Sequence, residues 1–114
     1  MSFRIVPATR AHLEEVGKGR PLPHTVRAVA VLDEDGALVG VGGVAYRGAA
    51  LEVFSDVKPA LKAHPMTLMR ATKIVLSWID RPAFATADPD EPTADSFLRR
   101  LGFEPKGEFY TWHG

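Results

Sequence analysis

One stretch, residues 51–79, constrains the fold more than any other part of the chain. It begins with the alternating run LEVFSDV, continues through the short basic segment KPALKAH, and becomes apolar at intervals of three or four residues after Pro65. The alternation predicts a strand, and the later spacing predicts a helix from Pro65 to Ile79. A helix that follows a strand points its unpaired N–H groups beyond the strand's end, where anions usually bind. This junction contains no glycine.

Length and charge exclude several classes of protein. A chain of 114 residues with a net charge of zero fits a single domain, residues 1–114, without general nucleic-acid or membrane binding. Cysteine is absent, which rules out disulfides and thiolate chemistry. The sequence has no signal-peptide pattern and no apolar run long enough to span a bilayer. We therefore expect a cytoplasmic protein.

The N-terminal half predicts one helix and a series of strands. Alternation over residues 3–6 predicts a strand, and Thr9 can cap a short helix that ends near Gly17. Residues 26–32 and 37–46 predict a hairpin around the turn DEDG. Three glycines lie within the second of these strands, and no helix follows them. They therefore predict a close backbone approach or a bulge rather than a phosphate loop.

The C-terminal half adds a short strand, a second helix and a closing hairpin after the long helix. Residues 83–87 predict the strand, and Thr93 can cap a helix over 94–101 that Gly102 ends. The last residues predict two strands around a glycine turn. The order of elements is thus strand, helix, three strands, helix, strand, helix and two strands. This order predicts an α+β sheet with helices on its faces.

The same order resembles the GNAT fold of acetyl-CoA-dependent N-acetyltransferases. The run ADSFLRRLGFEPKGEFYTW is similar to the family pattern Asn-x-x-Ala-x-x-x-Tyr-x-x-x-Gly-Phe, with Ala94, Gly102 and Phe103 at matching positions. The runs HPMTLMRATKIVLSWI and FLRRLGF also resemble small GNAT-like proteins of tailed phages, some of which are internal virion proteins. The resemblance implies a central, mostly antiparallel twisted sheet of about seven strands with helices on both faces.

The residues at the family's diphosphate loop depart from its pattern. The family holds the diphosphate with Gln/Arg-x-x-Gly-x-Gly/Ala, whereas residues 62–67 read KAHPMT. Pro65 has no N–H donor, and side chains replace the glycines beside the phosphates. Each hydrogen bond from a backbone N–H to a charged group is worth about 1.5–3 kcal/mol, so losing two of them would weaken binding by several powers of ten. The family's tyrosine, which protonates the departing thiolate, falls at Leu98, and its asparagine falls at Glu91.

The resemblance implies two groups of contacts for acetyl-CoA. The backbone of Phe54, Ser55 and Val57 would pair with the pantetheine arm. Two side chains and three amides at the start of the long helix would lie against the phosphates: Lys62, His64, Met66, Thr67 and Leu68. Four scattered histidines without ligand spacing predict no metal site.

Two side chains are candidates for acid or base chemistry. Glu52 lies where the resemblance places a general base, and a partly buried carboxylate can have the raised pKa which that role needs. The alternative is a solvated or ion-paired strand carboxylate. Tyr110 and Tyr46 are the available phenols, and Tyr110 can equally be a half-buried residue of the last strand.

Two surface features concern protein partners. A basic face on the two C-terminal helices could bind a partner or could be an ordinary solvated surface; its residues are Arg70, Lys73, Arg99 and Arg100. The last strand, residues 108–113, offers an aromatic edge through which two copies could form a homodimer.

Two hypotheses for function follow. The first is a non-catalytic structural or interaction protein of phage or prophage origin, with partners in a virion, because the loop glycines and the tyrosine are missing. The second is an acetyl-CoA-dependent N-acetyltransferase that acts on a primary amine with Glu52 as base. We expect weak acetyl-CoA binding in either case, and the fold alone does not choose between them.

Overall fold

A seven-stranded sheet forms the centre of the structure, a computed structural model that describes residues 2–17, 25–87 and 92–113. The strands lie in the order β1-β2-β3-β4-β5-β7-β6. They are β1 Arg4–Pro7, β2 Val26–Leu32, β3 Leu38–Arg47, β4 Ala50–Val57, β5 Ala83–Ala85, β6 Glu104–Lys106 and β7 Phe109–Trp112. Among the described strand pairs, β4 and β5 alone are parallel, so the sheet is mixed but mostly antiparallel.

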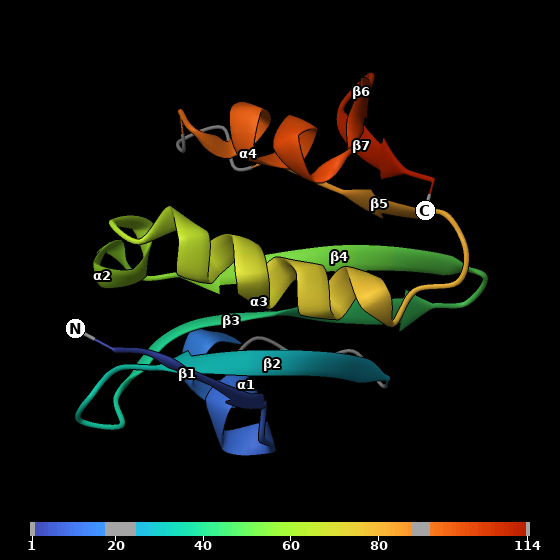
Figure 1. The fold of residues 1–114 in the computed structure, drawn as a ribbon. Helices are drawn as coiled ribbons and strands as arrows, with labels where there is room; N and C mark the ends of the chain where they lie inside the picture. The colour runs from blue at the N-terminus through green and yellow to red at the C-terminus, as the bar shows by residue number, and fades with distance from the viewer. Residues whose placement is uncertain (1, 18–24, 88–91, 114) are drawn as a thin grey trace.

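Helices cover both faces of this sheet, as Figure 1 shows. They are α1 Arg10–Gly17, α2 Pro59–Lys62, α3 Pro65–Ser77 and α4 Ala94–Leu101. On one face Leu13 of α1 packs against Ala30 and Val41, and on the other face Val75 of α3 packs in a cluster with Val29. Neighbouring residues of β2 therefore face opposite helices, as alternation in a strand requires. In the described parts of the chain, no helix is long and apolar enough to cross a membrane.

The α+β architecture and the order of elements confirm the prediction from sequence. Thr9 caps α1: its Oγ1 accepts a hydrogen bond from the His12 N–H at 3.2 Å, while His12 Nδ1 accepts one from the Thr9 N–H at 3.0 Å. Gly102 has a φ of 102°, so it ends α4 in the left-handed region as predicted.

The basic segment after β4 is partly helical, whereas the sequence predicts a loop. Pro59 stands at the start of α2, where its fixed φ suits a first turn, and Leu61 is only 1% exposed. Leu61 packs on β3 at Gly40, where an added Cβ would lie 2.7 Å from Leu61 Cδ2. At Gly43 an added Cβ would lie 2.4 Å from the carbonyl oxygen of Arg27. Both positions confirm the close approach predicted for the glycines of this strand.

Three predictions about the C-terminal half are wrong in detail. Helix α3 ends at Ser77, two residues before its predicted end. Thr93 precedes α4 without a side-chain capping bond, because its backbone is already helical rather than extended, and Ser96 Oγ donates to its carbonyl oxygen at 3.2 Å. The strand predicted over 108–113 is not an edge, since β7 lies between β5 and β6. The edge is β6, which contains Pro105.

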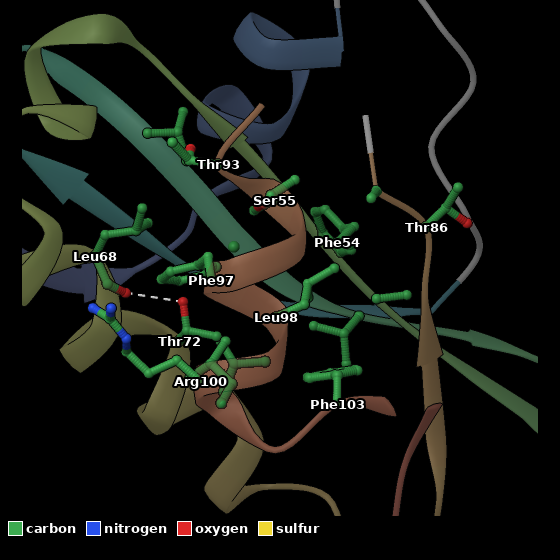
Figure 2. Close-up of a pocket in the computed structure, with 18 of the residues that line it drawn as sticks. Phe54, Ser55, Leu68, Thr72, Thr86, Thr93, Phe97, Leu98, Arg100 and Phe103 are labelled. Carbon is green, nitrogen blue, oxygen red and sulfur yellow. Dashed lines mark hydrogen bonds between the residues drawn. The ribbon is translucent and has the colours of Figure 1, made fainter. Parts of the chain in front are cut away.

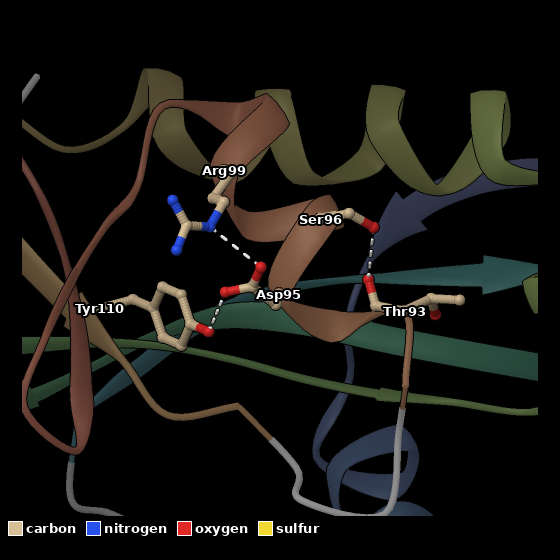
Figure 3. A network of polar contacts seen from close by, with 5 residues as sticks. All are labelled: Thr93, Asp95, Ser96, Arg99 and Tyr110. Carbon is tan, nitrogen blue, oxygen red and sulfur yellow. Dashed lines mark hydrogen bonds and ion pairs between the residues drawn. The ribbon is translucent and has the colours of Figure 1, made fainter.

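A polar network connects α4 to β7 (Figure 3). The Tyr110 hydroxyl donates to Asp95 Oδ1, and Arg99 Nε donates to Asp95 Oδ2 at 2.9 Å. The hydrogen bond from Tyr110 lowers the pKa of the Asp95 carboxyl and raises the pKa of the Tyr110 phenol. Because no residue of α4 is fully buried, this network adds to a packing that is only partial.

We expect Leu61→Ala to lower the free energy of unfolding by about 3 kcal/mol, because it empties a buried site between α2 and β3. The double variant Leu61→Ala/Gly40→Ala should lose less free energy of unfolding than the two single variants lose together, since the methyl group added at Gly40 fills part of the space that Leu61 leaves. Met66→Ala, at a side chain that is 83% exposed, is the control and should change stability by less than about 0.5 kcal/mol. Urea unfolding measures all four variants; strictly additive costs would contradict the contact.

We expect Tyr110→Phe to raise the pKa of Asp95 toward its ordinary value, because the variant lacks the donor that favours the carboxylate. A carboxyl whose pKa is lower in the folded than in the unfolded protein stabilises the fold at pH values above its unfolded pKa. That stabilisation is lost as the pH falls through its folded pKa. The stability difference between wild type and variant should therefore shrink below about pH 4. It should also shrink above about pH 10, where the phenol with its raised pKa ionises. A carboxyl NMR titration tests this, with Tyr46→Phe as control; an unmoved Asp95 pKa would refute it.

Candidate functional site

A cavity opens where β4 and β5 part. These two strands pair at Glu52 and Phe84, and no later residue of β4 has a partner in β5. Beyond that pair lies a cavity of about 670 Å³, lined by residues 52–57 of β4, by Ala85 at the end of β5 and the two residues after it, and by the facing sides of α3 and α4. This volume suits a small-molecule ligand. Figure 2 shows side chains from all of these elements converging on it.

The edge of β4 at this cavity carries unused backbone groups. The Lys58 N–H donates to the Val39 carbonyl oxygen at 2.8 Å, which fixes the alternation of the β3–β4 ladder. In an antiparallel ladder every second pair exchanges hydrogen bonds, so Phe54 is bonded to β3 while Ser55 and Val57 point their N–H and C=O groups away from β3. Those groups face the opening on the β5 side. The cavity therefore has a strand edge that can bond to an extended ligand.

Six of the ten residues predicted for the site line the cavity: Glu52, Phe54, Ser55, Val57, Lys62 and Leu68. The other four lie elsewhere. The His64 ring packs edge-on against Phe3 at 4.9 Å between centroids, and Met66 is 83% exposed. Thr67 is half-buried but is not part of the lining, and Tyr110 bonds to Asp95. The sequence thus identifies the β4 side of the cavity better than the helix side.

The first turn of α3 offers few amides to this cavity. Pro65 and Leu68 line it, but Pro65 has no N–H and Leu68 donates its N–H to the His64 carbonyl oxygen at 3.2 Å. The side chains of Met66 and Thr67 are not part of the lining. The amide cradle that a glycine-rich loop would supply is therefore missing from the described lining.

Helix α4 and the residue before it supply parts of the lining that the sequence interpretation missed. Thr93 precedes α4 and lines the cavity with Phe97 and Arg100 of that helix, at a spacing of four and then three residues. Arg100 reaches from α4 toward the Leu68–Thr72 turn of α3, where the Thr72 hydroxyl donates to the Leu68 carbonyl oxygen at 2.9 Å (Figure 2). The helical spacing from Phe97 was the available signal, since a residue three positions later lies on the same side of a helix.

The cavity has acidic side chains on its strand wall and basic ones on its helix walls. Glu52 and Asp56 come from β4, whereas Lys62 and Arg100 come from α2 and α4. Leu98 lines the cavity at the position where the family resemblance expects a tyrosine, and Glu91 lies outside the described residues. Within the described residues, no group of three metal-ligating side chains is close enough to hold a metal ion.

Comparison with solved structures identifies the fold. No protein-family model matches the chain, and no curated protein sequence matches it. Spermidine N-acetyltransferase of Vibrio cholerae is similar in structure, with a TM-score of 0.69 at 10% identity, covering 97% of this chain and 93% of that one. A candidate phosphinothricin N-acetyltransferase matches with a TM-score of 0.69 at 14% identity, covering 98% of each chain. A candidate acetyltransferase of Acinetobacter baylyi matches with a TM-score of 0.69 at 13% identity, covering 99% of this chain and 93% of that one.

These identities are too low to carry more than the fold. They give no support to the expected relation to tailed-phage proteins. What they do establish is the architecture: the chain has the GNAT acetyltransferase fold, with a seven-stranded, mixed and mostly antiparallel sheet.

Proposed function

We propose that this protein binds the acyl-pantetheine arm of a coenzyme A thioester in the cavity between β4 and β5, and that it acts as a binding protein rather than as an efficient transferase. The observation that carries the proposal is the open edge of β4, where Ser55 and Val57 present backbone groups to the cavity. Pantetheine is an extended chain with two amides. It can therefore add to such an edge as a further strand would.

The walls of the cavity suit the rest of that arm. Val75 of α3 and Phe97 and Leu98 of α4 provide apolar surface beside the strand edge. A ligand held by backbone hydrogen bonds on one side and apolar contacts on the other is typical of a cofactor site. The acyl thioester end would lie toward Glu52, where β4 and β5 meet.

Leu98 is the reason for proposing binding without efficient transfer. In the family pattern a tyrosine at this position protonates the departing thiolate, and leucine has no proton to give. No tyrosine is among the described residues that line the cavity, since Tyr110 bonds to Asp95 on the far side of α4 and Tyr46 is also outside the lining. The expected role in a virion has no support from the similar structures and is left out of the proposal.

The position of Glu52 favours a second candidate function. Glu52 lies in the lining at the point where β4 and β5 stop pairing, and strand alternation puts it on the same face as Phe54. A carboxylate there could accept a proton from a primary amine that attacks the thioester. This arrangement supports an acetyl-CoA-dependent N-acetyltransferase with slow thiolate release.

We expect Ser55→Pro to abolish acetyl-CoA binding, because proline removes the N–H that faces the cavity while the bonds of Phe54 to β3 remain. Ser55→Ala is the matched control, since it changes the side chain and keeps the N–H. Saturating acetyl-CoA at a hundred times its dissociation constant adds about 2.7 kcal/mol, or about 10 °C in melting temperature. Wild type and Ser55→Ala should show this shift.

The same thermal unfolding experiment can overturn the proposal. A wild-type protein with an unchanged melting temperature in millimolar acetyl-CoA does not bind it in the proposed way. An equal shift in wild type and Ser55→Pro would place the ligand somewhere other than on the β4 edge.

We expect Glu52→Gln to separate the two candidate functions. If the protein is a transferase, the variant should lose about a hundredfold or more in the rate of thiol release with a primary amine, while its acetyl-CoA shift stays the same. If the protein only binds, wild type and variant should release thiol equally slowly. Asp56→Asn, on the same face of β4, controls for the loss of one negative charge.

A further inference from the structure

The last strands of the sheet carry aromatic side chains on the face opposite α3 and α4. Two buried alanines of β5 face those helices, so Phe84 between them points to the other side. On β7, Tyr110 packs on the helix side, and alternation puts Phe109 and Thr111 on the side of Phe84. The rings of Phe84 and Phe109 meet edge-on, with centroids 5.7 Å apart. We call Phe84, Phe109 and Thr111 the C-terminal patch.

None of the helices that the structure describes packs on the C-terminal patch. Helix α1 lies on the same face but covers the other end of the sheet, where Leu13 packs against Ala30 and Val41 (Figure 1). As a result, Phe109 is 48% exposed, and Met66 is the other large apolar side chain that is exposed in the described part of the chain. An exposed ring beside a second ring is typical of a protein interface.

Two opposite charges border the patch on β6. Glu104 is paired with Thr111, and Lys106 is paired with Phe109, so both charged side chains share the face of the patch. Both are exposed, and neither forms an ion pair with any other described residue. The patch therefore has a negative and a positive group at alternate positions along one strand.

This arrangement of charges is complementary to itself. A two-fold axis that runs between two such sheets, across their strands at the level of Pro105, puts Glu104 of each copy opposite Lys106 of the other. The same axis puts Phe109 opposite Thr111 of the other copy, with its ring in the space between the sheets. The formal net charge of the chain is zero, so no long-range repulsion opposes the contact.

The edge of β6 is less suited to association than the face of the patch. This strand has three residues, and Pro105 in its middle has no N–H to donate to a strand of another copy. Continuation of the sheet from one copy into the next is therefore disfavoured. Packing face to face uses side chains that are already exposed.

We propose that two copies of this protein associate face to face through the C-terminal patch, with Phe109 at the centre of the contact and the pairs of Glu104 with Lys106 at its rim. A standard interface has about 20–30 residues on each side, so a contact centred on this patch forms a weak, concentration-dependent dimer. None of these residues lines the cavity between β4 and β5, so the dimer is independent of the function proposed above.

Sedimentation equilibrium from micromolar to millimolar protein tests this inference. Wild type should dimerise reversibly, and Phe109→Ser should raise the dissociation constant at least about thirtyfold, because each dimer contains two of these aromatic anchors. Met66→Ser, at the more exposed apolar side chain on α3, is the matched control and should dimerise as wild type. Both changes are at exposed positions, so circular dichroism should show both variants folded.

Charge reversal tests the two-fold geometry. Glu104→Lys puts positive charge opposite Lys106 of the other copy, and Lys106→Glu puts negative charge opposite Glu104, so each variant alone should dimerise about tenfold more weakly or worse. An equimolar mixture of the two should dimerise as wild type, because every facing pair in the mixed dimer again has opposite charges. Lys73→Glu, on exposed α3 surface, controls for the change in net charge.

Several outcomes would overturn the inference. A wild-type protein that is monomeric at millimolar concentration does not associate in this way, and the patch then belongs to a different partner. A dimer that Phe109→Ser leaves unchanged, or that Met66→Ser disrupts, uses another surface. Charge variants that dimerise as wild type, or whose mixture stays monomeric, exclude the facing of Glu104 and Lys106. The acetyl-CoA shift in melting temperature should be equal in wild type and Phe109→Ser, so failure of the proposed function is measured separately.

Discussion

The unequal pairing of β4 is the constraint on which the rest of the structure depends. On one side β4 forms a complete antiparallel ladder with β3, and on the other it pairs with β5 only at Glu52 and Phe84. Backbone groups left without strand partners must meet water or a ligand. The two helices that cover this side of the sheet, α3 and α4, enclose the opening and turn it into a cavity. The parting of two strands thus creates a binding edge at the centre of the sheet, far from its outer strands.

The junction after β4 lacks a glycine-rich anion-binding loop and contains the short helix α2. Helix α2 lies between β4 and residues 62–67, which stand at the position of the family's glycine-rich loop, and the burial of Leu61 against Gly40 holds α2 on β3. That contact fixes the direction of the chain on either side of it, including Lys62. As a result, positive charge reaches the cavity on flexible side chains rather than on fixed amides. Side-chain cations are screened by salt and lose conformational entropy on binding, so this cavity should hold phosphate less tightly than a rigid cradle would.

The sequence predicts the strands, the long helices and the β4 wall of the cavity, because their apolar periods are regular enough to determine both element and face. It does not predict α2, since four residues are too few to show a helical period and the burial of Leu61 depends on a glycine far away in the chain. The His64 ring is placed by its contact with Phe3, which is distant in the chain. The order of β7 and β6 depends on which strand of the closing hairpin pairs with β5, and local periodicity does not determine that. Arg100 is missed for a different reason: an arginine on a short helix normally indicates a solvated surface.

Helix α4 forms one wall of the cavity, yet none of its residues is fully buried. Its tie to β7 runs through Asp95, a carboxylate at the protein surface. Segments with few buried contacts open with less free energy than the whole domain needs to unfold. We therefore expect α4 to open at a lower free energy than the ladder between β3 and β4, which would widen the cavity without disturbing the central strands.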